Sequence, residues 1–268
     1  MRWDPTRYAA FQDERSRPFH DLVAQIGREA PRRVVDLGCG PGTLTATLAD
    51  RWPSAHVVGV DSSAEMLEQA QMSADAASLT ERHPNLSFEL AAIEDWTPTA
   101  SDDVVVTNAA LQWVPSHVEL LPGWLAAMPS DSWFAMQVPG NFDSPSHALM
   151  REVAAEGPWA PALSGVLRAD PVLDAAGYLE LFEDNGFAAT AWETTYMQLL
   201  PGEDPVLAWV RGTGLRPALA ALDAVDPTGE LTAAFEDTYA ARLRQAYPHG
   251  PHGTVFPFRR VFAVAHKR

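Results

Sequence analysis

Short apolar runs alternate with stretches of helical periodicity through the first half of the chain. The predicted strands cover residues 34–35, 57–61, 86–90, 104–107 and 133–138. The predicted helices cover residues 41–51, 63–77 and 116–127, after a first helix that starts near Pro18. Strands that alternate with amphipathic helices are typical of a doubly wound α/β domain with a mostly parallel sheet.

The pattern changes after residue 138. Residues 139–180 are rich in Pro and Gly and contain only short helical patterns, which suits a cover over a site better than a simple crossover. Strand character returns at 187–199 and 254–265, expected to pair antiparallel, with helical patterns at 203–211 and 228–246 between them. We therefore predict one domain over 1–268, a seven-stranded sheet, and a helical lid built from insertions at about 139–180 and 200–250.

Composition narrows the classes of partner. The 268 residues are 47% hydrophobic, and 35 acidic against 19 basic residues give a formal charge of −16. Such an acidic chain is a poor partner for nucleic acid or an anionic membrane, so neither is expected. Neither a signal peptide nor a membrane span is evident, which favours a cytoplasmic protein. The oligomeric state stays open.

The most informative segment follows the first predicted strand. Asp36 ends an apolar run, and three glycines follow at alternate positions, Gly38, Gly40 and Gly42, before a helix. A strand, a glycine turn and a helix form the nucleotide-binding corner of a doubly wound sheet. A carboxylate at this corner would repel a pyrophosphate but suits a cationic ligand. S-adenosylmethionine, which carries an ammonium and a sulfonium, is such a ligand.

A second acid supports the same interpretation. Asp61 ends the second predicted strand, about twenty residues after the glycine turn, where a carboxylate can accept hydrogen bonds from ribose hydroxyls. Ser62, Ser63 and Glu65 after it are typical of a helix N-cap and first turn. Cys39, the single cysteine, is expected to pack behind the turn rather than to act as a nucleophile.

Residues 30–140 resemble the class I S-adenosylmethionine-dependent methyltransferases, which implies a Rossmann-like fold. The resemblance implies that the backbone at 38–40 and Asp36 face the methionine end of the cofactor, and that Asp61 holds its ribose. The full set of implied cofactor-binding residues is Asp36, Gly38, Cys39, Gly40, Asp61, Ser62, Met66, Ala92, Ile93, Asn108 and Arg15.

One position departs from that family. Ala92 stands where the family often has an Asp that accepts from the adenine amino group. The backbone N–H of Ile93 could still bond the ring, and Glu94 or Asp95 could replace the missing acceptor. The departure weakens the adenine assignment and leaves the fold expectation intact.

A narrower resemblance extends over nearly the whole chain. The segments that carry it are 3–5, 15–18, 108–113, 137–141, 146–147, 192–196, 212–217 and 258–260. Together they resemble the family of carboxyl methyltransferases that esterify trans-aconitate. The acceptor-binding residues expected from this resemblance are Tyr8, Phe11, Gln112, Trp113, Asn141, His147, Tyr196, Arg216 and Arg259. Because side chains alternate along a strand, at most one of Arg259 and Arg260 points into the site.

The chemistry of such an acceptor needs few catalytic groups. A carboxylate with a pKa near 4 is already an anion at neutral pH, so positioning is the expected contribution, and neither a metal nor a covalent intermediate is predicted. Another small acid or a secondary-metabolite hydroxyl is the alternative acceptor, and a hydroxyl would need a base, for which His147 is the candidate. A non-catalytic binder of S-adenosylmethionine and a nicotinamide-dependent oxidoreductase also remain, although Asp36 disfavours the latter.

Overall fold

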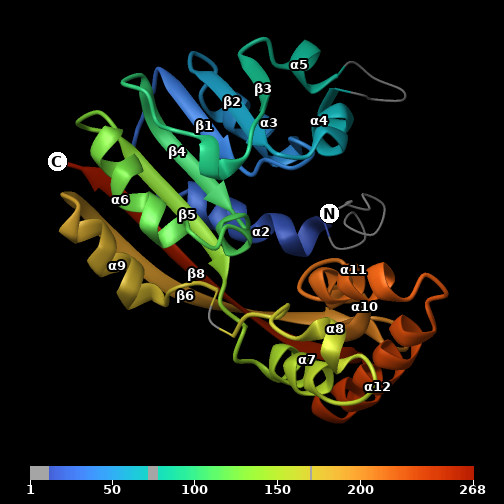
Figure 1. Cartoon of the computed structure of the whole chain (residues 1–268). Helices are drawn as coiled ribbons and strands as arrows, with labels where there is room; N and C mark the ends of the chain where they lie inside the picture. Colours follow the sequence, from blue (N-terminus) through green and yellow to red (C-terminus); the bar gives the residue numbers. More distant parts are fainter. Residues whose placement is uncertain (1–11, 72–77, 170) are drawn as a thin grey trace. The chain divides into compact units, whose positions relative to one another are not determined.

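A computed structural model describes residues 12–71, 78–169 and 171–268, and its central element is a twisted sheet with the strand order β3-β2-β1-β4-β5-β8-β6 (Figure 1). The pairs among β1 to β5 are parallel, whereas β8 runs antiparallel to β5. The strands are β1 Arg33–Leu37, β2 His56–Asp61, β3 Leu86–Leu90, β4 Asp102–Asn108, β5 Trp133–Pro139, β6 Phe187–Leu200, β7 His249–Gly250 and β8 Gly253–Lys267. The strand order reverses between the parallel strands β1 and β4, which is where an open α/β sheet binds its ligand.

Helices follow most of the strands. The α-helices are α2 Gln12–Val23, α3 Thr43–Arg51, α4 Ala64–Gln71, α5 Leu79–Arg82, α6 His117–Ala127, α7 Pro145–Ala155, α8 Ala160–Leu163, α9 Ala175–Asp184, α10 Pro205–Arg211, α11 Arg216–Val225 and α12 Glu230–Ala246. Two short 3-10 helices, η1 Ile93–Asp95 and η2 Leu111–Trp113, follow β3 and β4. Among the described residues, no helix is long and apolar enough to cross a membrane.

The described residues form two compact units. The first, here called the sheet unit, comprises 13–139, 172–194 and 260–268, and the second, the helical unit, comprises Gln12, 140–171 and 195–259. The strands β6 and β8 continue from one unit into the other along the chain. That the second unit covers a site as a lid stays a prediction.

The core of the sheet unit lies between the sheet and helices α6 and α9. Alternate residues of the strands are buried on this face, and apolar side chains of both helices pack on them. Representative members are Val35, Val105, Leu121, Phe134 and Phe182. Burying these side chains stabilises the unit by roughly 1.5–3 kcal/mol for each large apolar residue.

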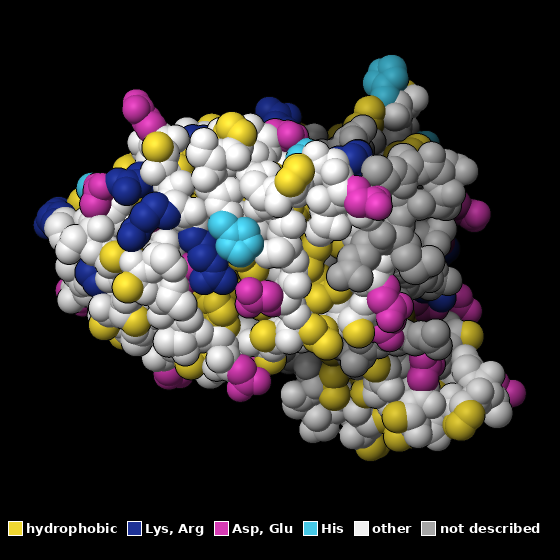
Figure 2. All heavy atoms as spheres, turned by 90° about the horizontal axis from the view of Figure 1, so that it is seen from above, with side chains coloured by type: hydrophobic (Ala, Val, Ile, Leu, Met, Phe, Trp, Pro, Cys, Tyr) yellow, Lys and Arg dark blue, Asp and Glu magenta, His cyan; other side chains and the backbone are white. Residues whose placement is uncertain are grey.

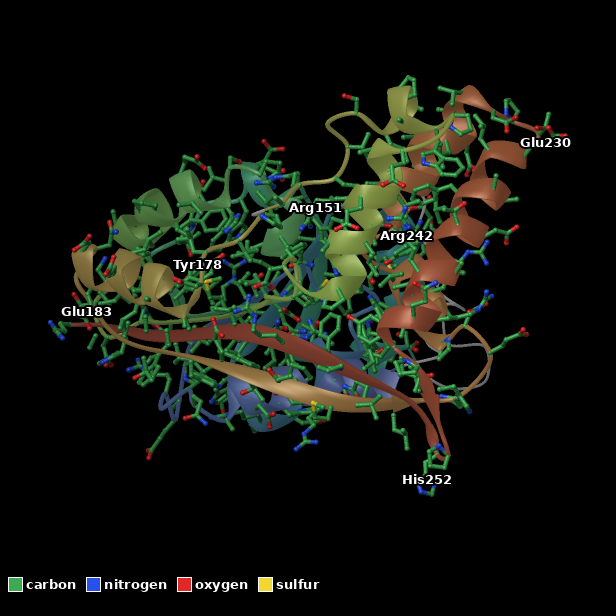
Figure 3. All side chains as sticks on the ribbon, turned by 90° about the horizontal axis from the view of Figure 1, so that it is seen from below. Arg151, Tyr178, Glu183, Glu230, Arg242 and His252 are labelled. Carbon is green, nitrogen blue, oxygen red and sulfur yellow. The ribbon has the colours of Figure 1, made fainter. Side chains whose placement is uncertain are left out.

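The helical unit has a separate core and a polar link between α7 and α12. The backbone of Ser146 in α7 donates to the hydroxyl oxygen of Tyr247 at 3.0 Å, and its carbonyl accepts from the hydroxyl of Tyr239 at 2.8 Å. Arg242 of α12 is labelled in Figure 3, and its guanidinium lies 3.5 Å from the carboxylate of Glu152 in α7. Buried tyrosines with satisfied hydroxyls hold the two helices in one register.

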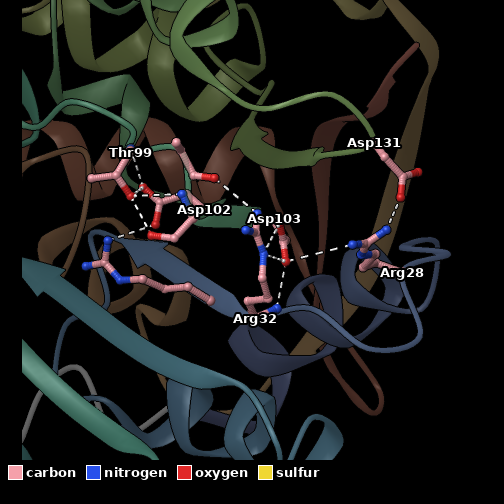
Figure 4. A network of polar contacts seen from close by, with 9 residues as sticks. Arg28, Arg32, Thr99, Asp102, Asp103 and Asp131 are labelled. Carbon is pink, nitrogen blue, oxygen red and sulfur yellow. Dashed lines mark hydrogen bonds and ion pairs between the residues drawn. The ribbon is translucent and has the colours of Figure 1, made fainter.

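Ion pairs join the amino ends of β1 and β4 (Figure 4). Asp103 accepts from the backbone N–H of Arg32 at 2.7 Å and from its guanidinium at 2.6 Å. Arg28 lies 3.8 Å from the same carboxylate, and Arg33 donates to Asp102 at 2.8 Å. This network lies at the edge opposite the carboxyl ends of the strands, so it supports the sheet and leaves the ligand edge free of these charges.

The space-filling view shows a surface of mixed charge. In Figure 2, Asp and Glu side chains are scattered over the visible face, and several Lys and Arg side chains gather beside a His. The basic groups of the amino-edge network are paired with acids. The expectation that the chain binds neither nucleic acid nor membrane stays a prediction.

Two sequence expectations need correction. The first helix includes Pro18 in its interior and begins at Gln12, because buried Phe19, Leu22 and Val23 anchor the helix beyond the proline. Helix α11 was not predicted from the sequence. The described part of the predicted helix at 63–77 is α4, Ala64–Gln71, and residues 72–77 lie outside the described residues.

Candidate active site

The glycine turn after β1 is held in a conformation that glycine tolerates best. Gly38 and Gly40 have φ values of +77° and +56°. A Cβ on Gly38 would lie 2.3 Å from the Cβ of Ala110, whereas a Cβ on Gly40 would meet nothing within 4 Å. Gly38 is therefore required by packing, and the open backbone at Gly40 suits the close approach of a ligand.

Asp36 is buried at the end of β1. Its Oδ2 accepts a hydrogen bond from the hydroxyl of Thr45 in α3 at 2.7 Å. Burial, which outweighs the hydrogen bond from Thr45 and is reinforced by the charge of Asp61, raises the pKa of this carboxyl to about 7. A carboxyl in this state gains charge when a cation binds beside it, which fits the ammonium of S-adenosylmethionine. The contribution of Thr45 was not predicted from the sequence.

Asp61 at the end of β2 joins two turns. Its Oδ2 accepts from the backbone N–H of Gly40 at 2.8 Å, and its Oδ1 accepts from that of Ser63 at 2.9 Å. Each carboxylate oxygen retains a further lone pair, so hydroxyl donors of a ribose could still be accommodated. Ser63, rather than exposed Ser62, caps the following helix through its Oγ, which accepts from the N–H of Met66 at 3.2 Å.

Cys39 behaves as a packing residue. The thiol is buried inside the glycine turn, and burial raises its pKa far above the ordinary value. A thiol held in the neutral form is a poor nucleophile. These properties favour the predicted packing role over a nucleophilic one.

The turn after β3 contains the predicted adenine site. Ala92 is the N-cap residue of η1, and Ile93 is buried while Glu94 and Asp95 are exposed. The Cδ1 of Ile93 would lie 3.5 Å from a Cβ on Gly38, so this turn borders the glycine turn. That proximity is what an adenosine bound along the sheet edge requires, and the roles of these residues stay predictions.

Polar side chains gather where β4 and β5 end. Ala109 has a φ of +54°, and its carbonyl accepts from the side-chain amide of Gln112 at 2.5 Å. Two buried atoms here, Asn108 Oδ1 and Gln112 Oε1, have no hydrogen-bond partner among the described residues. Strained backbone and open acceptors at one edge are features that a ligand can stabilise. Trp113 beside them is partly exposed.

His147 lies in the helical unit, buried at the start of α7. Its Nδ1 is 3.1 Å from Ser146 Oγ and 3.3 Å from Asn141 Nδ2. Burial, together with the charge of Arg151 and against the opposing charge of Asp143, lowers the pKa of His147 to about 4. The imidazole is therefore neutral at neutral pH and too weak a base to suit a hydroxyl acceptor.

The remaining predicted acceptor residues that the structure describes lie in the helical unit. Arg259 donates to the carbonyl of Gly140 and lies 3.2 Å from Asp143, all within the helical unit. In the same unit, Tyr196 is buried in β6 and Arg216 is the first residue of α11. Three predicted residues cannot be placed: Tyr8 and Phe11 lie outside the described residues, as does the side chain of Arg15.

The described residues contain no cluster of three His, Cys, Asp or Glu side chains that could hold a metal ion. The groups that the site does offer are the acids Asp36 and Asp61, the open backbone at Gly40 and the amides beyond β4. These groups fit a cationic nucleoside ligand at the carboxyl edge of the sheet.

This corner on this sheet topology defines a class I S-adenosylmethionine-dependent methyltransferase. Residues 34–127 match the family described as "Methyltransferase domain". The chain is 52% identical to the trans-aconitate 2-methyltransferase of Streptomyces coelicolor, over 99% of this chain and 86% of that protein. It is 50% identical to the enzyme of the same name from Rhodococcus jostii, over 98% of both. The chain belongs to the trans-aconitate 2-methyltransferase family.

Solved structures show the same fold at much lower identity. The YcgJ protein from Bacillus subtilis superimposes with a TM-score of 0.57 at 14% identity, over 94% of this chain and 98% of that one. The predicted Rossmann-like α/β fold is thus confirmed. The family match and the relatives of 50–52% identity confirm the class of enzyme and, with it, the cofactor S-adenosylmethionine.

Proposed function

We propose that this enzyme transfers the methyl group of S-adenosylmethionine to one carboxylate of trans-aconitate, which yields the monomethyl ester and S-adenosylhomocysteine. The observation that carries the proposal is the 52% identity, along almost the entire chain, to a relative named for this activity. The aligned region covers 99% of this chain, so it extends well beyond the cofactor corner.

The two acids of the site would bind different parts of the cofactor. Asp36 would face the ammonium of the methionine end, and the lone pairs left on Asp61 would accept from the ribose hydroxyls. The open backbone at Gly40 leaves room for the ligand to lie against the turn. When bound, S-adenosylmethionine supplies an electrophilic methyl group on a sulfonium.

The acceptor needs orientation rather than activation. A carboxylic acid with a pKa near 4 is ionised at neutral pH, so no side chain has to remove a proton. Holding one oxygen in line with the methyl group can supply up to roughly 7–11 kcal/mol of the barrier reduction. The neutral imidazole of His147 then serves as a hydrogen-bond donor rather than as a base.

A mass-spectrometric assay tests the proposal. The purified enzyme and S-adenosylmethionine are incubated with trans-aconitate, cis-aconitate, citrate or isopropylmalate, and each acid is examined for the gain of one methyl group. We expect a much higher kcat/KM for trans-aconitate than for the other three acids. Turnover of a different acid, or of none with cofactor binding intact, would overturn the choice of acceptor.

A further inference from the structure

Two adjacent arginines in β8 have different surroundings. Arg260 is buried, with 6% of its surface exposed, and its Nη1 donates to Oε1 of Gln137 in β5 at 3.4 Å. Arg259 is one-third exposed and pairs with Asp143 and the Gly140 carbonyl. Because consecutive side chains of a strand point to opposite faces, only one of the two can serve a given site on the sheet.

Strand register places Arg260 on the face that carries the cofactor acid. Asp36 of β1 is opposite Val106 of β4. Asn108 lies two residues after Val106 in β4 and is opposite Gln137 of β5. Arg260 is opposite Pro139, two residues after Gln137. Residues that are opposite one another, or two apart in a strand, share a face. A polar row therefore crosses β1, β4, β5 and β8, consisting of Asp36, Asn108, Gln137 and Arg260.

The hydrogen-bonding character changes along this row. At one end, the carboxylate of Asp36 and the open Oδ1 of Asn108 are acceptors. At the other end, Arg260 has only donors, so it contacts the oxygen of Gln137 and leaves the amide nitrogen of that residue as a second donor. Gln137 Nε2 is buried and has no hydrogen-bond partner among the described residues. A buried unpaired donor is costly unless a ligand satisfies it.

We propose that Arg260 and the side-chain amide of Gln137 bind a carboxylate of the methyl acceptor, an inference that rests on the proposed function. The acceptor end of the row matches the cationic methionine end of the cofactor, and the donor end matches an anion. Neighbouring strands are about 4.8 Å apart, so β1 and β8 are separated by about 14 Å, enough to seat both ligands in sequence along the row. The family resemblance favoured Arg259 of the pair, whereas the geometry assigns this role to Arg260.

Kinetics of matched arginine variants test the assignment. Arg260→Ala should raise the KM for trans-aconitate on the order of 100-fold or more, because it removes a buried partner of a charged group. Arg260→Lys should retain part of the affinity, since it keeps the charge and loses the bidentate fork. Gln137→Met should raise the same KM by about tenfold. Arg259→Ala tests the competing assignment, and Arg268→Ala, at the exposed residue that follows β8, is the control.

Binding of S-adenosylhomocysteine to each variant, measured by calorimetry, checks the fold. We expect its Kd to change by less than about threefold in the Arg260 variants, so that the loss is confined to the acceptor. The assignment is overturned if the Arg260 variants lose affinity equally for trans-aconitate and for S-adenosylhomocysteine. It is also overturned if Arg259→Ala raises the KM for trans-aconitate more than Arg260→Ala does.

A direct binding measurement separates this inference from the proposed function. Trans-aconitate is titrated into the enzyme saturated with S-adenosylhomocysteine. Binding that Arg260→Ala abolishes supports the site even if the wild-type enzyme does not methylate this acid. Wild-type turnover that Arg260→Ala leaves unchanged overturns the site and keeps the function. If the wild-type enzyme neither methylates nor binds trans-aconitate, the Arg260 site and the proposed function are both overturned.

Discussion

The carboxylate of Asp61 accepts a hydrogen bond from the backbone N–H of Gly40 at 2.8 Å, across the ends of β2 and β1. Asp61 thereby holds the glycine turn that follows Asp36. Asp61 also accepts from the N–H of Ser63, so it orients the start of α4 as well. Ligand binding and loop geometry are coupled through this single side chain.

Replacing Asp61 by Ala should weaken cofactor binding by roughly 1–3 kcal/mol, because an acceptor for the ribose and a support for Gly40 are both lost. Calorimetry with S-adenosylhomocysteine measures the effect, and Glu68→Ala, at an exposed position of α4, is the control. An unchanged Kd in Asp61→Ala would mean that the residue does not contact the ligand.

Cofactor binding should release protons through Asp36 below pH 7. Its pKa is about 7 in the free protein, and a cation beside it favours the ionised form. Affinity should therefore fall as the pH decreases from 7 to 5, and it should fall less in Asp36→Asn. Calorimetry at pH 6 in buffers of different ionisation enthalpy counts the protons, and equal counts in both proteins would contradict the assignment.

The same raised pKa affects stability without ligand. Because folding raises the pKa of Asp36 from 3.8 to about 7, its contribution is most favourable below pH 3.8 and is lost as the pH rises towards 7. The bound cofactor should offset that loss. Thermal unfolding of the wild-type protein and Asp36→Asn between pH 5 and 8, with and without S-adenosylhomocysteine, measures both effects.

Two glycine variants should separate packing from ligand approach. Gly38→Ala places a Cβ against Ala110 at a φ of +77° and should cost about 1–3 kcal/mol of unfolding free energy or more. Gly40→Ala meets no atom within 4 Å, so it should cost only the strain of a left-handed alanine, about 1–2 kcal/mol, and should in addition weaken cofactor binding. Urea unfolding and calorimetry on both variants check this. Equal stability losses would contradict the distinction.

Asp103 should stabilise the sheet at neutral pH and lose this effect in acid. Burial alone would raise the pKa of its carboxyl, but the hydrogen bonds and charge of Arg32, with the charge of Arg28, lower it overall. A lowered pKa gives stability that is present above the unfolded value of 3.8 and is lost as the pH falls through the folded value.

Asp103→Asn should therefore be less stable than the wild type at pH 7, by about 1–3 kcal/mol, with a smaller difference near pH 3. Urea unfolding at the two pH values measures both differences. Asp184→Asn, at the exposed end of α9, is the control. A difference that does not shrink in acid would exclude the ionised carboxylate as its source.

The pH dependence of turnover should show no base near neutrality. At saturating cofactor and acceptor, kcat should vary by less than about threefold between pH 6 and 9, because the acceptor is already ionised and the pKa of His147 is about 4. A limb near pH 7 that disappears in His147→Gln would instead favour an acceptor that needs deprotonation.

The sequence by itself determined the features that depend on local pattern. Apolar runs of strand length placed β1 to β5 to within about three residues, and the glycine spacing with Asp36 and Asp61 identified the cofactor corner. Both features are readable because backbone conformation and the charge of a short turn are set by neighbouring residues. The first helix was misplaced because Pro18 is a local signal that burial of Phe19 overrides.

Only the tertiary structure decided which residues share an environment. Because side chains alternate along a strand, the sequence showed that at most one of Arg259 and Arg260 faces the site. Choosing between them needed the register of β8 on β5, which pairs residues more than a hundred positions apart. The pKa of His147 and the contacts of Asp61 likewise depend on segments that meet only after folding. Burial and strand register are set by non-local packing, and a linear pattern does not contain them.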